Sequence, residues 1–318
     1  MILNKIKTFI KNPAAAVKNK REERWLEHVD YCMKPEVYPT LSDKEAIEAK
    51  FYRVFGKRLD LRHPKTYNEK LQWIKLYDRR PEYVSFVDKY EVKKVVADVI
   101  GEKYIIPTYG VWDRAEDIDF DALPDKFVLK CTHDSESVTI CKNKAEFDRE
   151  KAIAHLDRCL ERSMFLFGRE WPYKNVKPRI IAEKYLQNDD GSSLSDYKFF
   201  CFDGEVKTML IVSERFEHGS KLDYFALDGT HLPFTHTYPN AAVPPAFPKN
   251  FELMKSLAEK LSAGYPHIRP DFYECNGEVY FGELTFFTGS GFLPFQPEEW
   301  DYTFGSWIKL PKKKIKAN

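Results

Sequence analysis

Two acidic residues near the C-terminal end of this 318-residue chain, Asp271 and Glu283, stand where they could share a metal ion. They lie in the stretch RPDFYECNGEVYFGELTFFTGSG, residues 269–291, on either side of Asn276-Gly277, a dipeptide that favours a hairpin turn. Carboxylate oxygens are ligands that Mg²⁺ accepts, together with water and phosphate. If the two expected strands bring the carboxylates together, the hairpin can hold Mg²⁺. The alternative is a surface hairpin with solvated charges.

The register of this hairpin decides whether the carboxylates meet, because a slip of one residue turns a side chain to the opposite face. A two-residue turn at 276–277 pairs residue 275 with 278 and places Asp271 and Glu283 on opposite faces. A three-residue loop at 275–277, with Gly277 left-handed, pairs 274 with 278 and creates one polar and one apolar face. We predict this second register. Its polar face carries Arg269, Asp271, Glu283 and Thr285, and its apolar face carries Phe272, Tyr280, Leu284 and Phe286.

The composition is that of an ordinary globular protein, with 43% apolar and 31% charged residues. The net charge of +1 gives no overall field that would attract nucleic acid. No apolar run approaches the ~20 residues that a membrane-spanning helix needs. The cysteines lack any CxxC pair, which favours reduced thiols in the cytoplasm over a disulfide framework or a zinc site. They are Cys32, Cys131, Cys141, Cys159, Cys201 and Cys275.

Both ends of the chain are basic. The N-terminal stretch MILNKIKTFIKNPAAAVKNKREERW and the tail KLPKKKIKAN could contact an anionic membrane surface, which would place the protein at the inner face of the membrane. A solvated N-terminal helix is the favoured reading. The N-terminal stretch lacks the long apolar segment and cleavage site of a signal peptide.

The predicted secondary structure of the chain changes near residue 86. Residues 1–85 are mostly helical in pattern, with one helix after a capping serine at Ser42 and another in YNEKLQWIKLYDRRP, before Pro81. Beyond residue 86, short strands alternate with a few helices, and a second hairpin is expected at Asp203-Gly204. The pattern predicts an α+β fold with antiparallel sheets.

Five features in this order resemble the ATP-grasp fold: Asp88-Lys89 opening a helix, Lys130 ending a strand, the hinge Ala182–Leu186, Arg269-x-Asp271, and Glu283-x-Thr285. The segments DYKFFCFDGE, IRPDFYE and FGELTFFTGSGF are most similar to the TupA-like ATP-grasp proteins of surface-polysaccharide gene clusters. The resemblance covers residues 86–310 and implies two α+β subdomains that clamp ATP. The first would span residues 86–190 and contain the small nucleotide-clamping part. The second would span 191–310 and contain the metal-binding hairpin. The helical region 1–85 and a basic tail, 311–318, would flank them.

The resemblance also implies a role for individual residues in binding ATP. Lys89 and Lys130 would contact its phosphates, and Ser135 in the loop after Lys130 would belong to the nucleotide site. Glu183 would accept a hydrogen bond from the adenine amino group, and the backbone of Lys184 and Leu186 would read the edge of the base. Asp196 would lie near the ribose.

Another set of implied roles concerns the metal and the reaction. Asp271, Glu283 and Thr285 would hold Mg²⁺ on the triphosphate. Arg269 would lie beside the transferring phosphoryl group or the acyl-phosphate intermediate, and Lys198 and Arg215 would lie near the γ-phosphate.

The chain departs from the family pattern in two places. Thr285 stands where many ATP-grasp proteins have asparagine. The loop after Lys130 reads Thr132-His133-Asp134-Ser135-Glu136-Ser137, where a glycine-rich loop is expected to wrap phosphate with its backbone N–H groups. Either Asp134 and Glu136 point outward, or nucleotide binding is weakened, altered or lost.

The implied activity is ATP-dependent carboxylate–amine ligation, in which a carboxylate is activated as an acyl-phosphate and an amine attacks it. The expected substrates are an amine and a small-molecule or nucleotide-linked carboxylate, such as a uronic acid or an amino acid of a capsule polymer. One alternative is a glycosyltransferase that uses a nucleotide-sugar. It would need an Asp-x-Asp motif after a Rossmann-like strand, and the close acidic pairs of this chain (Asp117/Asp119, Asp119/Asp121 and Asp189/Asp190) lie in loop-like segments. Another alternative is a non-catalytic binding protein that keeps the fold.

Overall fold

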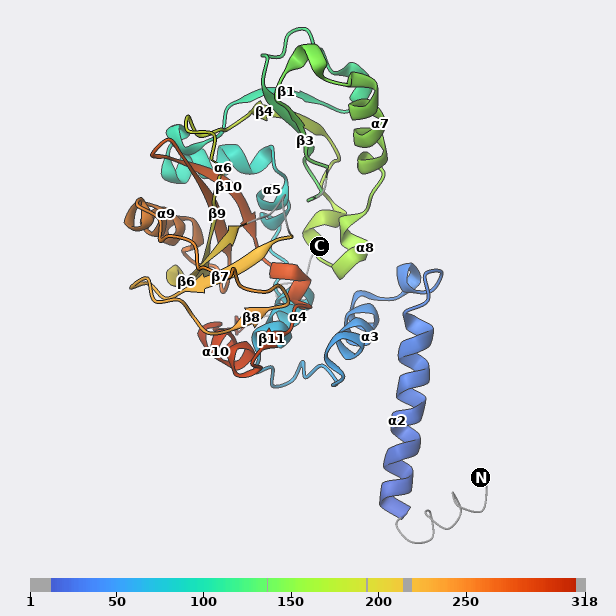
Figure 1. Cartoon of the computed structure of the whole chain (residues 1–318). Coiled ribbons are helices and arrows are strands. Elements are labelled where there is room, and N and C mark those ends of the chain that lie inside the picture. Colours follow the sequence, from blue (N-terminus) through green and yellow to red (C-terminus); the bar gives the residue numbers. More distant parts are fainter. Residues whose placement is uncertain (1–12, 136, 193, 214–218, 313–318) are drawn as a thin grey trace. The chain divides into compact units, whose positions relative to one another are not determined.

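The computed structural model describes residues 13–135, 137–192, 194–213 and 219–312 (Figure 1). The chain forms two compact units, residues 1–62 and residues 63–318. The helix that follows residue 62 is bound to the C-terminal part of the chain. Asp301 accepts a hydrogen bond of 2.9 Å from the backbone N–H of Asn68, and the Lys70 amine donates to the carbonyl of Gly305 at 2.7 Å.

The first unit contains helices α2 (Pro13–Cys32) and α3 (Asp43–Phe55), with a short 3-10 turn, η1 (Tyr38–Thr40), between them. The capping serine predicted for α3 is confirmed. Ser42 accepts a hydrogen bond from the backbone of Glu45, and the Glu45 carboxylate accepts one from the backbone of Ser42. Gly56 ends the helix with a left-handed φ of 66°.

The second unit contains the remaining helices and all strands of the described residues. The α-helices are α4 (Tyr67–Tyr77), α5 (Tyr83–Val87), α6 (Glu91–Ile100), α7 (Arg149–Leu160), α8 (Met164–Gly168), α9 (Phe251–Ser262) and α10 (Glu299–Trp307). The 3-10 turns are η2 (Glu102–Tyr104), η3 (Ala115–Asp117), η4 (Lys144–Glu146), η5 (Trp171–Lys174) and η6 (Thr288–Gly291).

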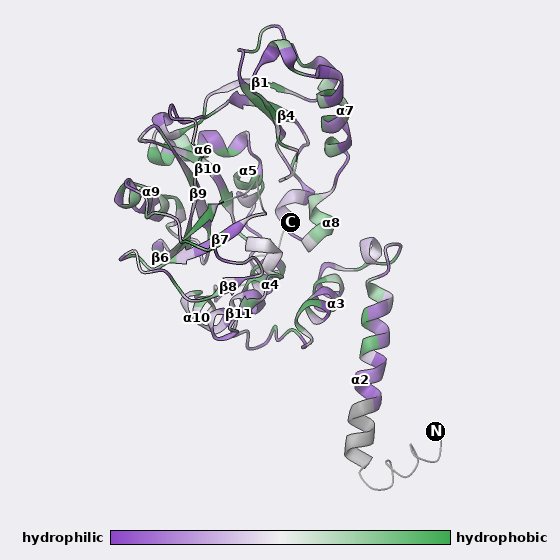
Figure 2. Ribbon diagram, viewed as in Figure 1, coloured by the Kyte–Doolittle hydropathy of each residue, from purple (hydrophilic) through white to green (hydrophobic). Residues whose placement is uncertain are grey.

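A four-stranded antiparallel sheet, in the order β1-β4-β2-β3, forms one half of this unit. Its strands are β1 (Thr108–Trp112), β2 (Phe127–Cys131), β3 (Thr139–Cys141) and β4 (Ile180–Lys184). Helix α7 packs on this sheet, and the core between them includes Phe127, Leu129, Leu156 and Ile180. Figure 2 shows hydrophobic residues along β4 and a mixture of hydrophobic and hydrophilic residues on α7, as expected for a helix with one buried face.

A five-stranded antiparallel sheet, in the order β10-β9-β5-β6-β7, forms the other half. Its strands are β5 (Asp196–Phe202), β6 (Glu205–Ser213), β7 (Lys221–Phe225), β9 (Arg269–Cys275) and β10 (Glu278–Thr285). The hairpin predicted at Asp203-Gly204 is confirmed as the β5–β6 connection. A small ladder joins β8 (Thr235–His236) to β11 (Phe295–Gln296). Together the two sheets and their helices confirm the predicted α+β class.

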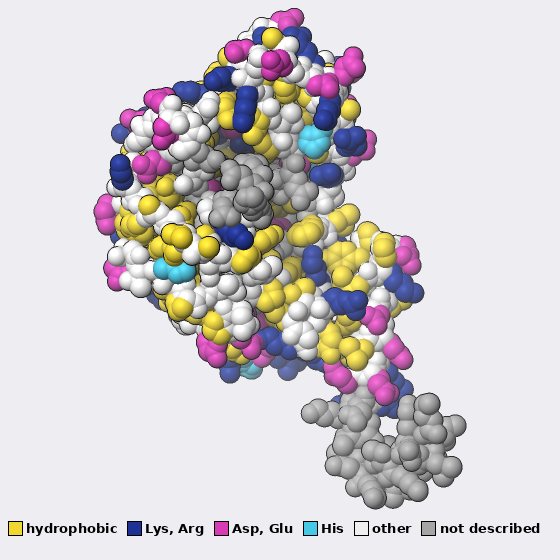
Figure 3. All heavy atoms as spheres, viewed as in Figure 1, with side chains coloured by type: hydrophobic (Ala, Val, Ile, Leu, Met, Phe, Trp, Pro, Cys, Tyr) yellow, Lys and Arg dark blue, Asp and Glu magenta, His cyan; other side chains and the backbone are white. Residues whose placement is uncertain are grey.

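On the face of the second unit shown in Figure 3, side chains of Lys and Arg alternate with those of Asp and Glu. Within the described part of the chain, no helix combines the length and apolar character that crossing a bilayer requires. The basic segments 1–12 and 313–318 lie outside the described residues.

Candidate functional site

The hairpin β9–β10 has a different turn from the one predicted. Cys275 pairs with Glu278, so the connection is the two-residue turn Asn276-Gly277 rather than a three-residue loop at 275–277. Both turn residues have positive φ, 51° at Asn276 and 81° at Gly277. This is the conformation that an Asn-Gly turn favours, because its twist matches that of the two strands. The predicted three-residue loop is therefore wrong.

A β-bulge nevertheless brings the two carboxylates to one face. The register shifts between Phe281 and Glu283, so that Asp271 pairs with Glu283 and Arg269 with Thr285. The extra residue is Gly282, where a Cβ would lie 3.0 Å from the Tyr273 ring and 3.2 Å from the carbonyl oxygen of Asp271. The expected polar face thus exists, but the bulge creates it rather than the turn.

The observed register also shows that the predicted position of Tyr280, on the apolar face, is wrong. Between the turn and the bulge, Tyr280 pairs with Tyr273, two residues from Asp271, and therefore lies on the polar face rather than on the apolar one. Phe281, which pairs with Phe272, takes the apolar position, and both phenyl rings are buried. Between the bulge and the turn, this face therefore carries Tyr273 and Tyr280, which pack against a cluster that includes Leu186 and Cys275.

Arg269 organises the carboxylates. Its Nε and Nη2 atoms donate to the two oxygens of Asp271, each at 2.7 Å, in a bidentate pair. Nη2 also donates to Thr285 at 3.0 Å and to Glu283 at 3.4 Å, and Nη1 donates to Thr288 at 3.2 Å. Arg269 and Asp271 are almost fully buried, whereas the side chain of Glu283 is 41% exposed.

Lys198 enters the same cluster from the neighbouring strand. It lies directly opposite Asp271 in the β5–β9 ladder, and its amine contacts the Asp271 carboxylate. The same amine lies 2.7 Å from an oxygen of Asp196. The residues predicted to lie near the metal, the ribose and the γ-phosphate therefore meet in one ion cluster, with the exception of Arg215, which lies outside the described residues.

Burial and the neighbouring charges shift the pKa values within this cluster. Burial raises the pKa of Asp271 to about 6, although Arg269 and Lys198 oppose the shift. Burial also disfavours the ionised form of Glu283, but Lys198, Lys89 and Arg269 outweigh it and lower the pKa of Glu283. At neutral pH both carboxylates are therefore ionised.

The donor set suits a hard cation that also binds phosphate. The two ionised carboxylates face each other, and the Thr285 hydroxyl adds a neutral oxygen next to Glu283, at 3.4 Å. Within the described ranges, no group of three or more His, Cys, Asp or Glu side chains could hold a metal by itself. Mg²⁺ bound here would therefore take its other ligands from water and from the substrate. Asp271 would have to share its oxygens with Arg269 and Lys198.

A second ion cluster lies on the four-stranded sheet. Glu183 on β4 is buried, and its carboxylate pairs with Lys130 on β2 and, at 2.6 Å, with Lys93 on α6. Although burial favours the neutral carboxyl, Lys130 and Lys93 outweigh it and lower the pKa of Glu183. The role of Glu183 as acceptor for the adenine amino group stays a prediction, because both of its oxygens already face lysines.

Lys93 was not predicted, although the sequence contained a signal for it. It lies in the first turn of α6, four residues after the predicted phosphate-binding Lys89, which precedes the helix. Its amine is also fixed by the carbonyl of Ile106 at 2.6 Å and by the hydroxyl of Thr108 at 2.7 Å.

The loop after Lys130 places Asp134 inside the protein rather than outward. Asp134 is 2% exposed and accepts a hydrogen bond from Ser137, whose hydroxyl also accepts one of 2.7 Å from the backbone of Cys131. Lys89 donates to the backbone carbonyl of Asp134. Of the two alternatives that the sequence left open, the outward orientation therefore does not apply to Asp134. Glu136 lies outside the described residues, and Ser135 is exposed.

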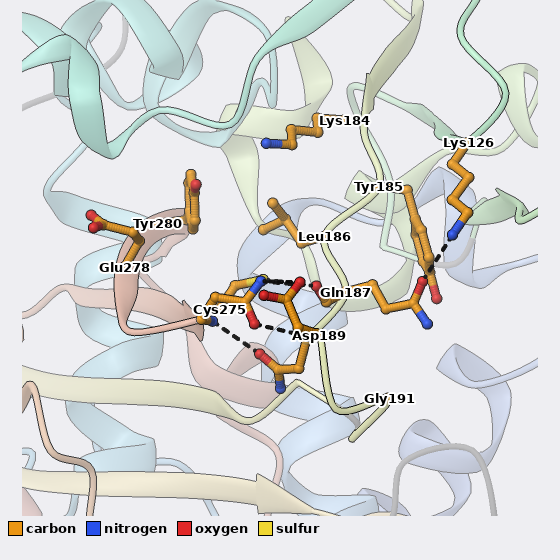
Figure 4. A pocket seen from close by; sticks show the side chains of 12 residues that line it. Lys126, Lys184, Tyr185, Leu186, Gln187, Asp189, Gly191, Cys275, Glu278 and Tyr280 are labelled. Atoms are coloured by element: carbon orange, nitrogen blue, oxygen red, sulfur yellow. Dashed lines mark hydrogen bonds between the residues drawn. The ribbon is translucent and has the colours of Figure 1, made fainter.

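A pocket of about 560 Å³ lies between the hinge and the hairpin turn (Figure 4). Lys184 and Leu186, both predicted to read the base, line it together with Tyr280 and Cys275 of the hairpin. In Figure 4 the Leu186 and Tyr280 side chains lie on opposite sides of one space, below Lys184. The backbone N–H of Lys184 already donates to the carbonyl of Pro107, at 2.9 Å.

The turn residue Asn276 holds the segment after the hinge, residues 187–189, against the hairpin. Its side-chain oxygen accepts a hydrogen bond of 2.8 Å from the backbone of Asp189, and its backbone donates to the side chain of Asn188 at 3.1 Å. The Cys275 thiol lies 3.4 Å from the carbonyl of Gln187. These contacts fix one wall of the pocket to the strand that carries Asp271.

The Thr-Gly-Ser-Gly loop that follows β10 is fixed by helix α4. Lys75 is fully buried, and its amine donates to the carbonyls of Gly168, at 2.6 Å, and Ser290, at 2.8 Å. Gln72 donates to the carbonyls of Ser290, at 3.1 Å, and Gly291, at 2.6 Å. Ser290 has a left-handed φ of 55°, and its hydroxyl contacts the carboxylate of Glu170. Sequence patterns gave no sign of this clamp.

Comparison with known proteins supports the same fold. Residues 69–309 match the family model described as TupA-like ATP-grasp. No curated protein matches the chain. Among solved structures, the chain is similar to D-alanine–D-alanine ligase from Helicobacter pylori, at 15% identity over 76% of this chain and 69% of that chain, with a TM-score of 0.42.

Two further solved structures are similar. One is D-alanine–D-alanine ligase from Bacillus anthracis complexed with ATP, at 15% identity over 63% of this chain and 53% of that chain, with a TM-score of 0.36. The other is ATP-grasp ligase PsnB complexed with minimal precursor, Mg and ADP, at 10% identity over 69% of this chain and 57% of that chain, with a TM-score of 0.38. Because the family model spans most of the sequence, the chain belongs to the TupA-like ATP-grasp family and has the ATP-grasp fold.

Proposed function

We propose that this protein is an ATP-dependent carboxylate–amine ligase that forms an amide through an acyl-phosphate. The observation that carries the proposal is the face of the β9–β10 hairpin that bears Asp271 and Glu283, on which Tyr273 and Tyr280 pack against Leu186 and Cys275 between the ion cluster and the turn. This face borders the pocket at its turn and carries the ionised cluster of Arg269, Asp271 and Glu283 beyond the bulge. Four residue steps separate Cys275 from Asp271, which places the ion cluster ~13 Å along the strand from the wall of the pocket.

In this proposal the base occupies the pocket, between Leu186 and Tyr280, and the triphosphate runs along the hairpin toward Asp271. Lys130 on strand β2 and Lys89, just before helix α6, supply positive charge to the phosphates, and Asp196 lies at the ribose. Asp271, Glu283 and Thr285 would hold Mg²⁺, which would supply positive charge to the transferring phosphoryl group.

The chemistry proceeds in two displacements. A carboxylate oxygen of the first substrate attacks the γ-phosphorus, the bond to the β-γ bridging oxygen breaks, and ADP leaves. The nitrogen of the amine then attacks the acyl carbon, phosphate leaves with the C–O electron pair, and the nitrogen loses a proton. Arg269 stabilises the anionic phosphoryl group, so that the protein contributes positioning and charge rather than a covalent nucleophile.

For the substrate, we propose a uronic acid or an amino acid of a capsule or other cell-surface polysaccharide, presented free or linked to a nucleotide. The similarity of the DYKFFCFDGE and FGELTFFTGSGF segments to TupA-like proteins supports this choice. The proposed location is the cytoplasm, with the basic ends of the chain contacting the inner face of the membrane.

The glycosyltransferase alternative has less support. The two main sheets of the described residues are antiparallel, whereas a nucleotide-sugar site of the Rossmann type needs parallel strands. The close acidic pairs around Asp119 and at Asp189-Asp190 are exposed rather than gathered at the end of a strand.

The proposed function is tested by measuring ADP release. The wild-type chain is incubated with Mg²⁺, ATP and a panel of uronic acids, nucleotide-linked uronates and amino acids, each with and without amines. We expect ADP release that requires one carboxylate and increases with one amine, together with an amide product in mass spectrometry. Sugar transfer from a nucleotide-sugar, without ATP consumption, would overturn the proposal.

A further inference from the structure

Lys198 is a buried lysine that bridges two carboxylates with different proposed roles. It is 6% exposed, and its amine contacts both Asp196 and Asp271, which are 5% and 1% exposed. The contact with Asp271 follows from the fold, because the two residues are directly opposite each other on adjacent strands. One amine therefore joins the ribose end of the proposed site to its metal end.

The cluster around this amine has its own charge balance. Arg269 and Lys198 contribute two positive charges, and Asp196, Asp271 and Glu283 contribute three negative charges. The net charge of the cluster is therefore −1, which attracts a divalent cation weakly. Without Lys198 the net charge of the same groups would be −2. The Asp271 oxygen that Lys198 contacts would then be left with Arg269 as its cation.

We propose that Lys198 is the resident counter-ion of the metal site and makes metal binding depend on the nucleotide. It keeps Asp271 neutralised while the site holds no nucleotide, so that the divalent ion binds weakly on its own. The phosphates of the nucleotide offset the charge of Lys198 and supply further oxygen ligands, so that metal and nucleotide bind together. This inference rests on the proposed function, since it assigns Lys198 a part in the same Mg-ATP site.

A purely structural role for Lys198 predicts something different. Neutralising a structural ion pair would lower the stability of the protein and would leave the affinity for a divalent cation unchanged or weakened. A counter-ion role predicts tighter metal binding when the charge is removed. The two roles therefore differ in the sign of the change in metal affinity.

The experiment measures Mn²⁺ affinity of the full chain by electron paramagnetic resonance, with and without a non-hydrolysable ATP analogue. It compares the wild type with Lys198→Met, which removes the charge, and with Lys198→Arg, which keeps it. Lys198→Gln replaces the Met variant if circular dichroism shows that the latter does not fold. Lys207→Met is the matched control, because Lys207 is a half-exposed lysine of the adjacent strand β6 that pairs with Glu205.

We expect Lys198→Met to bind Mn²⁺ without nucleotide about tenfold more tightly than the wild type, because a unit charge next to the ion has been removed. The gain in Mn²⁺ affinity on adding the analogue should shrink in this variant and should persist in Lys198→Arg and Lys207→Met. Unchanged or weaker nucleotide-free binding in the folded Lys198→Met and Lys198→Gln variants overturns the counter-ion role.

The same data separate this inference from the function on which it rests. If the wild type binds Mn²⁺ with the analogue and Glu283→Gln does not, the metal site stands whatever Lys198 does. If the wild type binds no Mn²⁺ even with the analogue, both the proposed function and the counter-ion role are refuted.

Discussion

Replacing Arg269 with methionine isolates the cost of leaving Asp271 buried without its bidentate partner. Two hydrogen bonds of 2.7 Å disappear, and Lys198 remains as the cation in contact with a carboxylate that is 1% exposed. Breaking a buried ion pair by removing one partner typically costs about 3–5 kcal/mol. Because Lys198 remains, we expect a loss of about 3 kcal/mol in the free energy of unfolding at pH 7.5.

The loss should depend on pH in a defined direction. Burial already raises the pKa of Asp271 to about 6, and without Arg269 this pKa rises further. An acid whose pKa is higher in the folded state takes up protons more readily there than in the unfolded chain, so its contribution to stability falls as pH rises. The deficit of the variant should therefore be largest near neutral pH and should shrink toward pH 5, by up to about 1.4 kcal/mol per unit.

Urea unfolding at pH 7.5 and pH 5, followed by tryptophan fluorescence, measures both effects. The double variant Arg269→Met/Asp271→Asn serves as the control and should recover most of the lost stability, since it no longer buries an unpaired charge. A deficit below 1 kcal/mol at pH 7.5, or one of equal size at both pH values, would refute this account of the cluster.

Three further predictions concern single groups. Glu283→Gln should change the free energy of unfolding by less than about 1 kcal/mol, because the side chain is 41% exposed, yet abolish Mg-ATP turnover; full activity would exclude a metal-binding role. Burial lowers the pKa of His236 and His267 to about 3, so both stay neutral in the fold while the unfolded chain takes up protons below pH 6.5. Each of these histidines should lower the free energy of unfolding by about 2 kcal/mol at pH 5. A free energy of unfolding that is the same at pH 7 and pH 5 would contradict this. Asp134→Asn should bind ATP several-fold more tightly by removing a buried negative charge from the phosphate loop, whereas equal affinity in calorimetry would show that no repulsion acts there.

The fold was predictable because its signals are local and ordered along the chain. The Ser42 cap, the Asn276-Gly277 turn and the order of lysines and carboxylates are all visible in the sequence. The placement of Asp271 and Glu283 on one face was also anticipated, but for the wrong reason. Tertiary crowding decides where a bulge forms, and the close approach of Tyr273 and the Asp271 carbonyl to Gly282 has no counterpart in the periodicity of the strand.

Other parts of the site depend on contacts between distant segments. The burial of Asp134 depends on a serine hydroxyl three residues later and on the strand that ends at Cys131. Lys75 is a charged residue on an otherwise amphipathic helix, and a single sequence gives no reason to place it inside. Such residues are found only when the partner carbonyls are known.

The hydrogen bonds from Gln72 and Lys75 of helix α4 to the Thr-Gly-Ser-Gly loop also limit where this chain could be divided by recombination during evolution. Lys75 and Gln72 bind carbonyls of segments more than ninety residues away, so α4 cannot be separated from the sheet that carries the proposed site. The heritable module therefore begins at this helix, in agreement with the family match from residue 69. A recombination point inside residues 63–85 would deliver a chain whose Thr-Gly-Ser-Gly loop has lost its anchor. The short connection between the two compact units, around residues 62 and 63, is where a module boundary leaves that anchor intact.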